Sequence, residues 1–548
     1  MRPSPEAARR ALSRVAPLAE ASTRHFPLAG GVLALADRDG LVDSFAFGHA
    51  DLERGVPTSA AHLFEIGSIS KLFTSLVIDR LVAEGRLAHG DPVGAHLPWA
   101  GLSPSLSRAR VVGLLTHTAG LPLGSDGLAD DAGELWASRA VAVADVDPPR
   151  FHYSNLGYLV LGEVARALTG RRLPELVAEW LLGPLGMATA RSEIAWADRG
   201  ALATGYAPAR PDRPWVPGDP LAPAPYFETD SAAGNVAAGA ADMAALVAAL
   251  LRAAAGEAGG AISPETFARV TTTLAPTGEP THTPPGTLAV SASRYGLGLN
   301  VERVGESLCV THGGGMVGYS TFLLVDCTLG LGVVVLTNAN GDALASHLLA
   351  RALHAQVVAE ASATTLALPD LDPAVRGALP GSGAFVDDEG EALLVSAGDG
   401  RLSYRGLEGA LYSTPTGRFV TDHPELRTFH LDHHPGGHWT HGPTTFAPAG
   451  AGRPARGPSP ALAGRYRSYS PWYPEFRVVA RAGRLYLNAP GGVEAPDEEV
   501  ELIEVAPGAY RIGADPWLPE RLVAGPVRDG EVVAVVRDGL GYSRAFRA

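Results

Sequence analysis

Residues 64–71 read FEIGSISK, and this octapeptide decides the fold of the chain. Its first three residues, Phe64-Glu65-Ile66, predict a short strand. Apolar residues then recur at helical spacing from position 69 to position 77, so a helix follows the strand at once. Ser68 and Lys71 are three residues apart and therefore share one face of that helix. The octapeptide predicts a serine at a helix start, with an amine in reach of its hydroxyl.

Ser68 and Lys71 together supply a nucleophile and a nearby base. A serine hydroxyl attacks a carbonyl only when a neighbouring base takes its proton, and the N-terminal end of a helix favours developing negative charge. Lys71 is the single lysine among 44 basic residues. Arginine cannot give up its proton in a protein, whereas a buried lysine can. The lone lysine therefore indicates a catalytic base rather than a solvated helix start.

A second motif, Tyr153-Ser154-Asn155, stands just before a helix predicted from residue 156. A tyrosine phenol beside a lysine can pass a proton, and the amide of Asn155 can donate to a substrate carbonyl. Ser154 and Asn155 are also good residues for capping a helix. Both roles are compatible, because the cap would position the site.

A third motif, His312-Gly313-Gly314-Gly315, directly follows a predicted strand. Glycines in a strand let another backbone lie close to it, so a substrate could bind along Gly314 and Gly315. The N–H groups of Gly315 and Ser68 could then form an oxyanion hole. A flexible glycine turn is the alternative interpretation.

In this order the three motifs resemble those of the penicillin-recognising serine hydrolases, in particular the branch of class C β-lactamases, DD-peptidases and esterases. The resemblance covers residues 20–350 and extends to further segments. These are LLTHTAGLP at 114–122, YSNLGY at 153–158, AGNV at 233–236 and YGLG at 295–298.

The resemblance implies a role for each motif residue. Ser68 would be the acylated nucleophile, Lys71 its base, and Tyr153 the proton shuttle to the leaving group and from the deacylating water. The residues implied to contact substrate are Asn155, His312, Gly314 and Gly315. Many relatives have a lysine where this chain has His312. A neutral histidine weakens the preference for substrates with a carboxylate, which disfavours β-lactams.

Composition excludes several classes of protein. With 548 residues, 46% of them hydrophobic, the chain can bury a large core, while a net charge of −14 disfavours nucleic acid and anionic membranes as partners. No apolar run reaches transmembrane length, and residues 26–36 predict a first strand rather than a signal sequence. The two cysteines, Cys309 and Cys327, exclude a disulfide scaffold. We expect a cytoplasmic protein with reduced thiols.

The order of strand and helix patterns predicts an α/β (α+β) catalytic domain over residues 1–362. Seven prolines between positions 206 and 226 predict a stiff extended loop or lid. Two segments then share an offset: a glycine precedes the sequences GRLSY at 400–404 and GRLYL at 483–487 by 19 residues each. They predict two small all-β domains, barrels or lipocalin-like, at 368–449 and 461–548, with a linker at 450–460.

A catalytic domain followed by two β domains resembles the three-domain D-aminopeptidases. In those enzymes a loop of the last barrel selects substrates with a free amine, and the acidic residues 491–501 could attract an ammonium here. A solvated hairpin tip is the interpretation we favour for this loop. Histidines between positions 423 and 441 have spacing compatible with zinc, but glycines and a proline interrupt them. We expect neither a metal nor a cofactor.

The sequence thus predicts a serine hydrolase that cleaves an amide or ester through an acyl-enzyme on Ser68. The D-aminopeptidase resemblance implies small peptides or amides with a D-residue. An esterase and an acyltransferase or peptide cyclase of the same fold are alternatives, and a non-catalytic binding protein is a further one. The expected partner is a small molecule or short peptide, and a homodimer stays open.

Overall fold

The computed structural model describes residues 3–124, 133, 135–136, 149–281, 283–375, 379, 381–396, 398–454, 460–493, 495–496 and 498–545. The chain forms two compact units. The first, called the catalytic unit below, comprises Met1–Ala207 and Pro223–Asp370. The second, called the barrel unit, comprises Leu371–Ala548 together with Pro208–Ala222, a segment called the arm.

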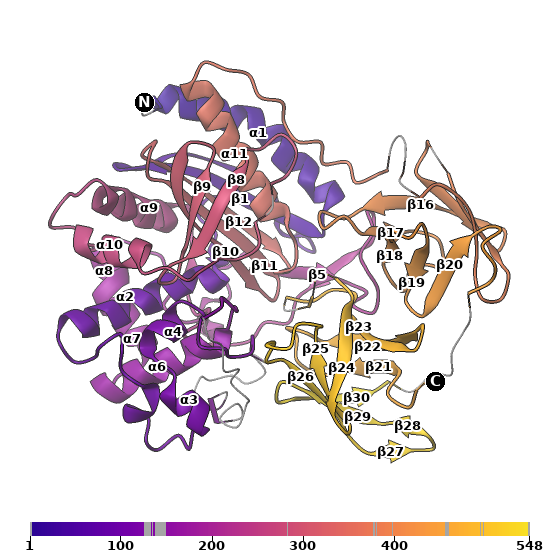
Figure 1. Cartoon of the computed structure of the whole chain (residues 1–548). Coiled ribbons are helices and arrows are strands. Elements are labelled where there is room, and N and C mark those ends of the chain that lie inside the picture. Colours follow the sequence, from indigo (N-terminus) through magenta and orange to yellow (C-terminus); the bar gives the residue numbers. More distant parts are fainter. Residues whose placement is uncertain are drawn as a thin grey trace. The chain divides into compact units, whose positions relative to one another are not determined.

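The catalytic unit is built on an antiparallel sheet of eight strands with the order β3-β2-β1-β12-β11-β10-β9-β8 (Figure 1). The strands are β1 (Leu28–Asp37), β2 (Gly40–Asp51), β3 (Val56–Pro57), β8 (Val290–Tyr295), β9 (Asn300–Val304), β10 (Ser307–Met316), β11 (Tyr319–Asp326) and β12 (Leu331–Ala339). Every residue of β11 and β12 is buried, so both faces of the sheet are covered.

Helices cover the two faces separately (Figure 1). On one face α1 (Pro5–His25) and α11 (Ala345–Ala361) pack together, and a side chain at Gly313 would collide with His347 of α11. On the other face lies α9 (Ala240–Ala254), where a side chain at Gly332 would meet Val247. The register places Gly314 on the α9 face, because it pairs with Thr321 and Thr321 pairs with Leu336.

The remaining helices and short strands form a helical region that carries the predicted nucleophile. Its helices are η1 (Gly67–Ile69), α2 (Ser70–Ala83), η2 (Val93–Ala95), α3 (Pro104–Arg108), α4 (Val111–Leu115), α6 (Asn155–Thr169), α7 (Leu173–Val177), η3 (Ala178–Leu182), α8 (Gly183–Leu185), η4 (Trp196–Asp198) and α10 (Pro264–Thr272). The strand β4 (Phe64–Glu65) pairs with β7 (Ala237–Ala238). Helix α2 packs against α6 and α7.

The barrel unit contains two closed antiparallel barrels. The first consists of β13 (Gly383–Val386), β14 (Ala392–Val395), β15 (Arg401–Tyr404), β16 (Leu407–Ser413), β17 (Phe419–Thr421), β18 (Leu431–His433), β19 (Trp439–His441) and β20 (Thr444–Pro448). The second consists of β21 (Gly464–Arg467), β22 (Glu475–Arg481), β23 (Arg484–Asn488), β24 (Val500–Ala506), β25 (Ala509–Ile512), β26 (Arg521–Ala524), β29 (Ala534–Arg537) and β30 (Leu540–Arg544), with β27 (Val527–Arg528) and β28 (Glu531–Val532) as a separate hairpin. Each encloses its own apolar cluster.

The fold class predicted from the sequence is confirmed: an α/β catalytic fold is followed by two all-β barrels. The repeated segments at 400–404 and 483–487 each lead into the third strand of a barrel, β15 and β23. Closure leaves a barrel without unpaired edges, which explains how such short strands can form a stable sheet. The boundaries of three separate domains stay a prediction, and residues 455–459 of the expected linker lie outside the described residues.

Three details differ from the expectations. The strand β10 does not stop before His312 but continues to Met316, because every residue from Cys309 to Met316 pairs with β11. The proline-rich stretch is not wholly irregular, since β5 (Tyr206–Pro208) and β6 (Leu221–Pro223) form a two-stranded ribbon at the base of the arm. The N-terminal helix α1 was not expected.

Across the described ranges, no helix is both long and apolar enough to span a bilayer.

Candidate active site

Ser68 lies in η1, directly before α2, where the backbone of strand β10 passes very close. A Cβ atom on Gly314 would lie 2.0 Å from the carbonyl oxygen of Ile66, and one on Gly67 would lie 2.7 Å from the backbone nitrogen of Gly315. Gly67 also has a φ of +53°, which favours glycine. Glycine at both positions therefore lets the strand and the nucleophile segment touch along their backbones, with Ser68 half-buried beside them.

Lys71 is fully buried on the first turn of α2, and its amine joins three parts of the catalytic unit. The Nζ atom lies 3.0 Å from Ser68 Oγ, 2.7 Å from Asn155 Oδ1 and 3.0 Å from the carbonyl oxygen of Ala233. The last two groups are neutral acceptors. Burial disfavours the charged form of an amine, so a buried lysine suits the role of a base.

Tyr153 and Asn155 flank the start of α6, and the helix cap fixes both. Ser154 is the N-cap residue: its hydroxyl accepts a hydrogen bond from the N–H of Gly157 and donates to the carbonyl of Pro122. Asn155 thereby points its carbonyl at Lys71. The Tyr153 ring centroid lies 5.0 Å from Lys71 Nζ.

His312 is fully buried on β10, and its hydrogen bonds define its protonation state. The Nδ1 atom faces the carbonyl oxygen of Gly313 at 2.5 Å and must donate to it. In the neutral ring Nε2 then accepts from the Tyr295 hydroxyl at 2.8 Å. Burial lowers the pKa of His312. The third motif therefore presents a neutral imidazole and not a cation.

His117 forms the base of an aromatic cluster behind Tyr153. Its ring centroid lies 4.3 Å from that of Tyr153 and 4.6 Å from that of Tyr295. The Nδ1 atom accepts the backbone N–H of Ser154 at 3.1 Å, and the residue has a φ of +55°. Burial holds the pKa of His117 well below its usual range. A neutral His117 supports the Tyr153 ring and the helix cap.

This geometry can be compared with known proteins, and the sequence profile of the beta-lactamase family matches residues 20–357. The chain belongs to the beta-lactamase family.

Three similar proteins extend the comparison. A teichoic acid D-alanine hydrolase from Staphylococcus aureus is 29% identical over 152 residues, which span 27% of this chain and only 37% of that protein. The penicillin-binding protein homologue from Pyrococcus abyssi, described as octameric, aligns with a TM-score of 0.54 and 18% identity over 92% of this chain and 98% of its own. D-Amino acid amidase from Ochrobactrum anthropi aligns with a TM-score of 0.50 and 19% identity over 65% of this chain and 99% of its own. At these identities the two structures establish the fold alone.

The residues that the sequence predicts as a site lie close together in the fold, while their roles stay a prediction. Ser68, Lys71 and Asn155 form one hydrogen-bonded chain, Tyr153 lies over the lysine, and the glycines of β10 lie against the nucleophile segment. Sequence reasoning missed the carbonyl of Ala233 as a partner of the lysine. An alanine side chain gives no sign that its backbone is used, although the segment 233–236 was marked as family-like.

The buried carboxyl of Glu65 was also missed. It lies on β4, three residues before the nucleophile, and is 5% exposed. Burial raises its pKa to about 8, so the carboxyl is largely protonated at neutral pH. The alternation of a short strand would have placed it facing solvent, but both residues of β4, which pairs with β7, are buried.

Two groups of candidate metal ligands have other partners. In the histidine-rich stretch, His441 Nε2 bonds the carbonyl of Leu426 and His434 Nε2 bonds the hydroxyl of Thr440. In the described part of the catalytic unit, Cys309, Asp326 and His354 bring ligand atoms within 4.8 Å of one another. His354 Nε2 and Asp326 Oδ2 form a buried hydrogen bond of 2.9 Å that ties α11 to β11.

The sequence leaves two interpretations of the acidic loop at 491–501: it attracts the ammonium of a substrate, or it is a solvated hairpin tip. Residues 494 and 497 lie outside the described residues. Of the others, Glu499 pairs with Arg481 and Glu501 pairs with Arg484 at 3.3 Å. These two carboxylates already have cationic partners within the barrel unit, and the Glu499 side chain, only 10% exposed, differs from the solvated charge that a hairpin tip would carry.

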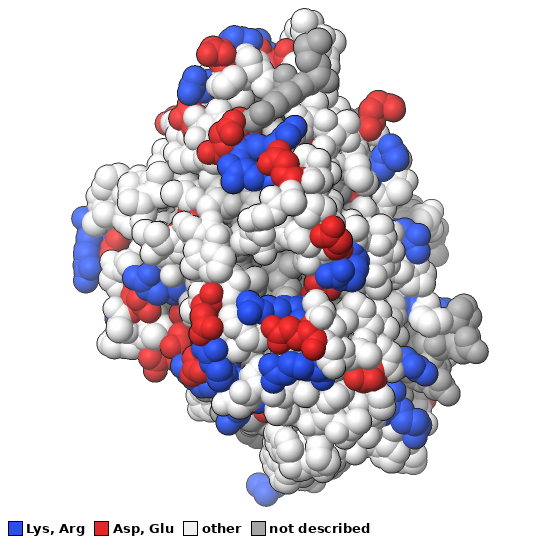
Figure 2. Space-filling view, turned by 90° about the vertical axis from the view of Figure 1, so that its left-hand side faces the viewer, with Lys and Arg blue, Asp and Glu red and all other residues white. Residues whose placement is uncertain are grey.

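Charge on the surface follows the same pattern of pairing. Figure 2 shows one face of the molecule, on which acidic and basic side chains alternate within a mostly uncharged surface. On the described part of that face there is no continuous basic stripe, which a nucleic-acid-binding surface requires.

Proposed function

We propose that this chain is a serine hydrolase that works through an acyl-enzyme on Ser68 with Lys71 as the general base. The observation that carries the proposal is the 3.0 Å contact between Ser68 Oγ and the Nζ atom of the fully buried Lys71. A nucleophile and its base must lie within hydrogen-bond reach. The acceptors Asn155 and Ala233 hold the amine in place for this contact.

The reaction then follows from the groups present. The Ser68 oxygen attacks the substrate carbonyl while its proton passes to Lys71. Tyr153 delivers a proton to the departing amine or alcohol as the bond between carbonyl carbon and leaving group breaks. Water attacks the resulting ester with the same groups in reverse order, and the acid leaves with Ser68 restored.

The oxyanion of each tetrahedral intermediate is assigned to the backbone N–H groups of Ser68 and Gly315. Support comes from the contact of the two backbones, because the missing Cβ positions of Gly67 and Gly314 leave room for nothing larger than hydrogen. Two preorganised N–H donors stabilise developing negative charge where water is excluded.

We further propose that the acyl group is a D-amino acid, in a small amide, peptide or ester. The names of two similar proteins, a teichoic acid D-alanine hydrolase and a D-amino acid amidase, support a D-amino acyl group. The neutral His312 supports substrates without a free carboxylate at that position. The two thiols are free, which fits the proposed cytoplasmic location.

The test is hydrolysis of D-alanine p-nitroanilide beside its L-alanine and N-acetyl-D-alanine counterparts, with Ser68→Ala as the blank. Selective turnover of the free D-amine is expected. Turnover of the L-compound at an equal rate would contradict the D-amino acyl assignment but leave the Ser68 mechanism intact.

An esterase is the second candidate, and the D-alanine hydrolase relative is the reason to keep it. The p-nitrophenyl ester of D-alanine should be tested in parallel, because p-nitrophenolate is a better leaving group than p-nitroaniline. Turnover of the ester alone would identify an esterase. Formation of a new amide when a free amine is added would identify an acyltransferase instead.

A further inference from the structure

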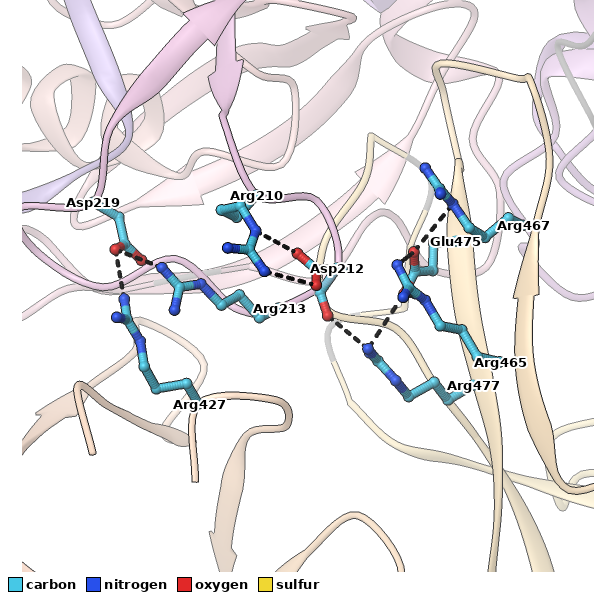
Figure 3. Close-up of polar contacts among 9 residues, drawn as sticks. All are labelled: Arg210, Asp212, Arg213, Asp219, Arg427, Arg465, Arg467, Glu475 and Arg477. Carbon is cyan, nitrogen blue, oxygen red and sulfur yellow. Dashed lines mark hydrogen bonds and ion pairs between the residues drawn. The ribbon is translucent and has the colours of Figure 1, made fainter. Parts of the chain in front are cut away.

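The arm and both barrels bring together a cluster of arginines in the barrel unit, shown in Figure 3. The arm belongs to the barrel unit, although the residues before and after it in the sequence belong to the catalytic unit. The residues of this arginine cluster are Arg210, Asp212, Arg213 and Asp219 of the arm, Arg427 of the first barrel, and Arg465, Arg467, Glu475 and Arg477 of the second.

Two of the three carboxylates in the cluster are each contacted by more than one arginine. Asp219 accepts from both Arg213, at 2.9 Å, and Arg427. Glu475, with a 1% exposed side chain, forms a bidentate pair with Arg465 at 2.6 Å.

Two further arginines reach the same carboxylate of Glu475 only loosely, Arg467 at 3.5 Å and Arg477 at 3.4 Å. Asp212 pairs with Arg210 through two contacts of 3.1 and 3.2 Å. Six guanidinium groups thus share three carboxylates, which leaves three positive charges uncompensated in a chain whose net charge is −14.

Part of this surplus positive charge lies on arginines that are largely shielded from solvent. The side chains of Arg213 and Arg477 are only 16% and 11% exposed. Buried nitrogen atoms of Arg213, Arg427 and Arg477 have no hydrogen-bond partner among the described residues. Burial and neighbouring arginines lower the pKa of Arg213 and of Arg477. In the sheet, Arg465 and Arg477 stand directly opposite each other on β21 and β22, where like charges are destabilising.

The cluster also has an accessible side. Arg210 and Arg467 are 58% and 57% exposed, and Arg465 is 35% exposed. An anion can therefore approach the exposed guanidinium groups while the buried ones supply positive potential behind them. A planar guanidinium matches phosphate oxygens in a bidentate geometry. A surplus of three charges matches a multiply charged phosphate better than a single carboxylate.

We propose that the arginine cluster is a binding site for a phosphate group, either inorganic phosphate or a phosphomonoester. Arg210 and Arg467 contact the anion from the solvent side, and the inner arginines hold it electrostatically. This site is separate from the hydrolytic chemistry and does not depend on the proposed function.

The test is isothermal titration of the full chain with inorganic phosphate and with glycerol phosphate, at an ionic strength held constant with sodium chloride. Saturable binding at one site is expected. Arg467→Gln and Arg210→Gln should each weaken it about tenfold, the usual effect of losing a charge-assisted hydrogen bond. Asp212→Asn should tighten binding, because it removes a competing negative charge.

Arg401→Gln and Arg484→Gln are the matched controls, one in each barrel. Both arginines are exposed and pair with a single glutamate outside the cluster, so each substitution removes the same charge at a similar surface position. Binding should be unchanged in both. Because Arg210 and Arg467 are also exposed, their variants should fold, and circular dichroism checks this.

The proposal fails if the wild-type chain shows no saturable binding of either compound, or if Arg467→Gln and Arg484→Gln weaken binding equally. Tighter binding of glycerol phosphate than of phosphate would identify an organic phosphate as the ligand. Equal or weaker binding of glycerol phosphate would identify inorganic phosphate.

Discussion

Replacement of Glu65 by glutamine should remove a pH dependence from the stability of the catalytic unit. The carboxyl of Glu65 is 5% exposed and its pKa is raised from 4.5 to about 8 by burial. In the unfolded chain the same carboxyl returns to its ordinary pKa. Folding therefore takes up a proton at every pH between these two values.

The sign and size of the effect follow from this linkage. The folded state binds more protons than the unfolded state above pH 4.5, so the stabilisation is complete at lower pH and is lost as pH rises toward 8. Each pKa unit corresponds to about 1.36 kcal/mol. Glu65 should therefore lower the free energy of unfolding of the catalytic unit by about 3 kcal/mol between pH 5 and pH 7.5. Glutamine has nearly the same shape and carries no charge, so Glu65→Gln should lack this loss.

The assay is urea unfolding of both proteins at pH 5 and pH 7.5, with short pulses of protease that digest only unfolded chain. A gel then reports the folded fraction of the catalytic unit separately from the barrels, which matters because a chain of two units need not unfold in one step. Glu257→Gln is the control, since Glu257 is an exposed carboxylate paired with Arg38. If Glu65→Gln and wild type lose equal stability between the two pH values, the carboxyl is ionised in the folded protein and the reasoning from burial is wrong.

Three other substitutions test the site and the core. Lys71→Arg should lower kcat/KM by about 10³-fold or more, because a guanidinium cannot accept the serine proton; a variant with full activity on the same substrate would exclude Lys71 as the base. His312→Lys should raise kcat/KM for substrates with a free carboxylate relative to their amides by about tenfold, since it supplies the missing cation; an unchanged ratio would show that this position does not contact substrate. Glu302→Gln should lower the free energy of unfolding by about 3 kcal/mol, because it leaves Arg351 buried without its partner at 2.7 Å; urea unfolding measures this, and a loss below 1 kcal/mol would contradict it.

The catalytic fold and the site could be predicted because they depend on local patterns. The strand, the helix and the spacing of Ser68 and Lys71 are all encoded within eight residues. The glycines of β10 also had a visible cause, since consecutive glycines in a strand indicate close approach of another backbone. Both signals remain valid whatever lies elsewhere in the chain.

Other features depend on contacts between distant residues and left no local signal. The carbonyl of Ala233 holds Lys71 across 162 positions of sequence, and any residue type has such a carbonyl. Glu65 is buried on β4, whose pairing partner β7 lies far along the sequence. The seven prolines between positions 206 and 226 predict an extended loop or lid. They give no sign that charged residues of the arm contact arginines of both barrels in the arginine cluster.

The most direct test of the mechanism is to trap the acyl-enzyme. The chain is mixed with p-nitrophenyl acetate, quenched in acid within the first turnover and digested with pepsin, and the acetylated residue is located by mass spectrometry. We expect one acetyl group on Ser68, in wild type and in the neighbouring control Ser70→Ala, and none in Ser68→Ala. An acetyl group on another serine, or a burst of p-nitrophenol that persists in Ser68→Ala, would contradict the assignment of Ser68 as the nucleophile.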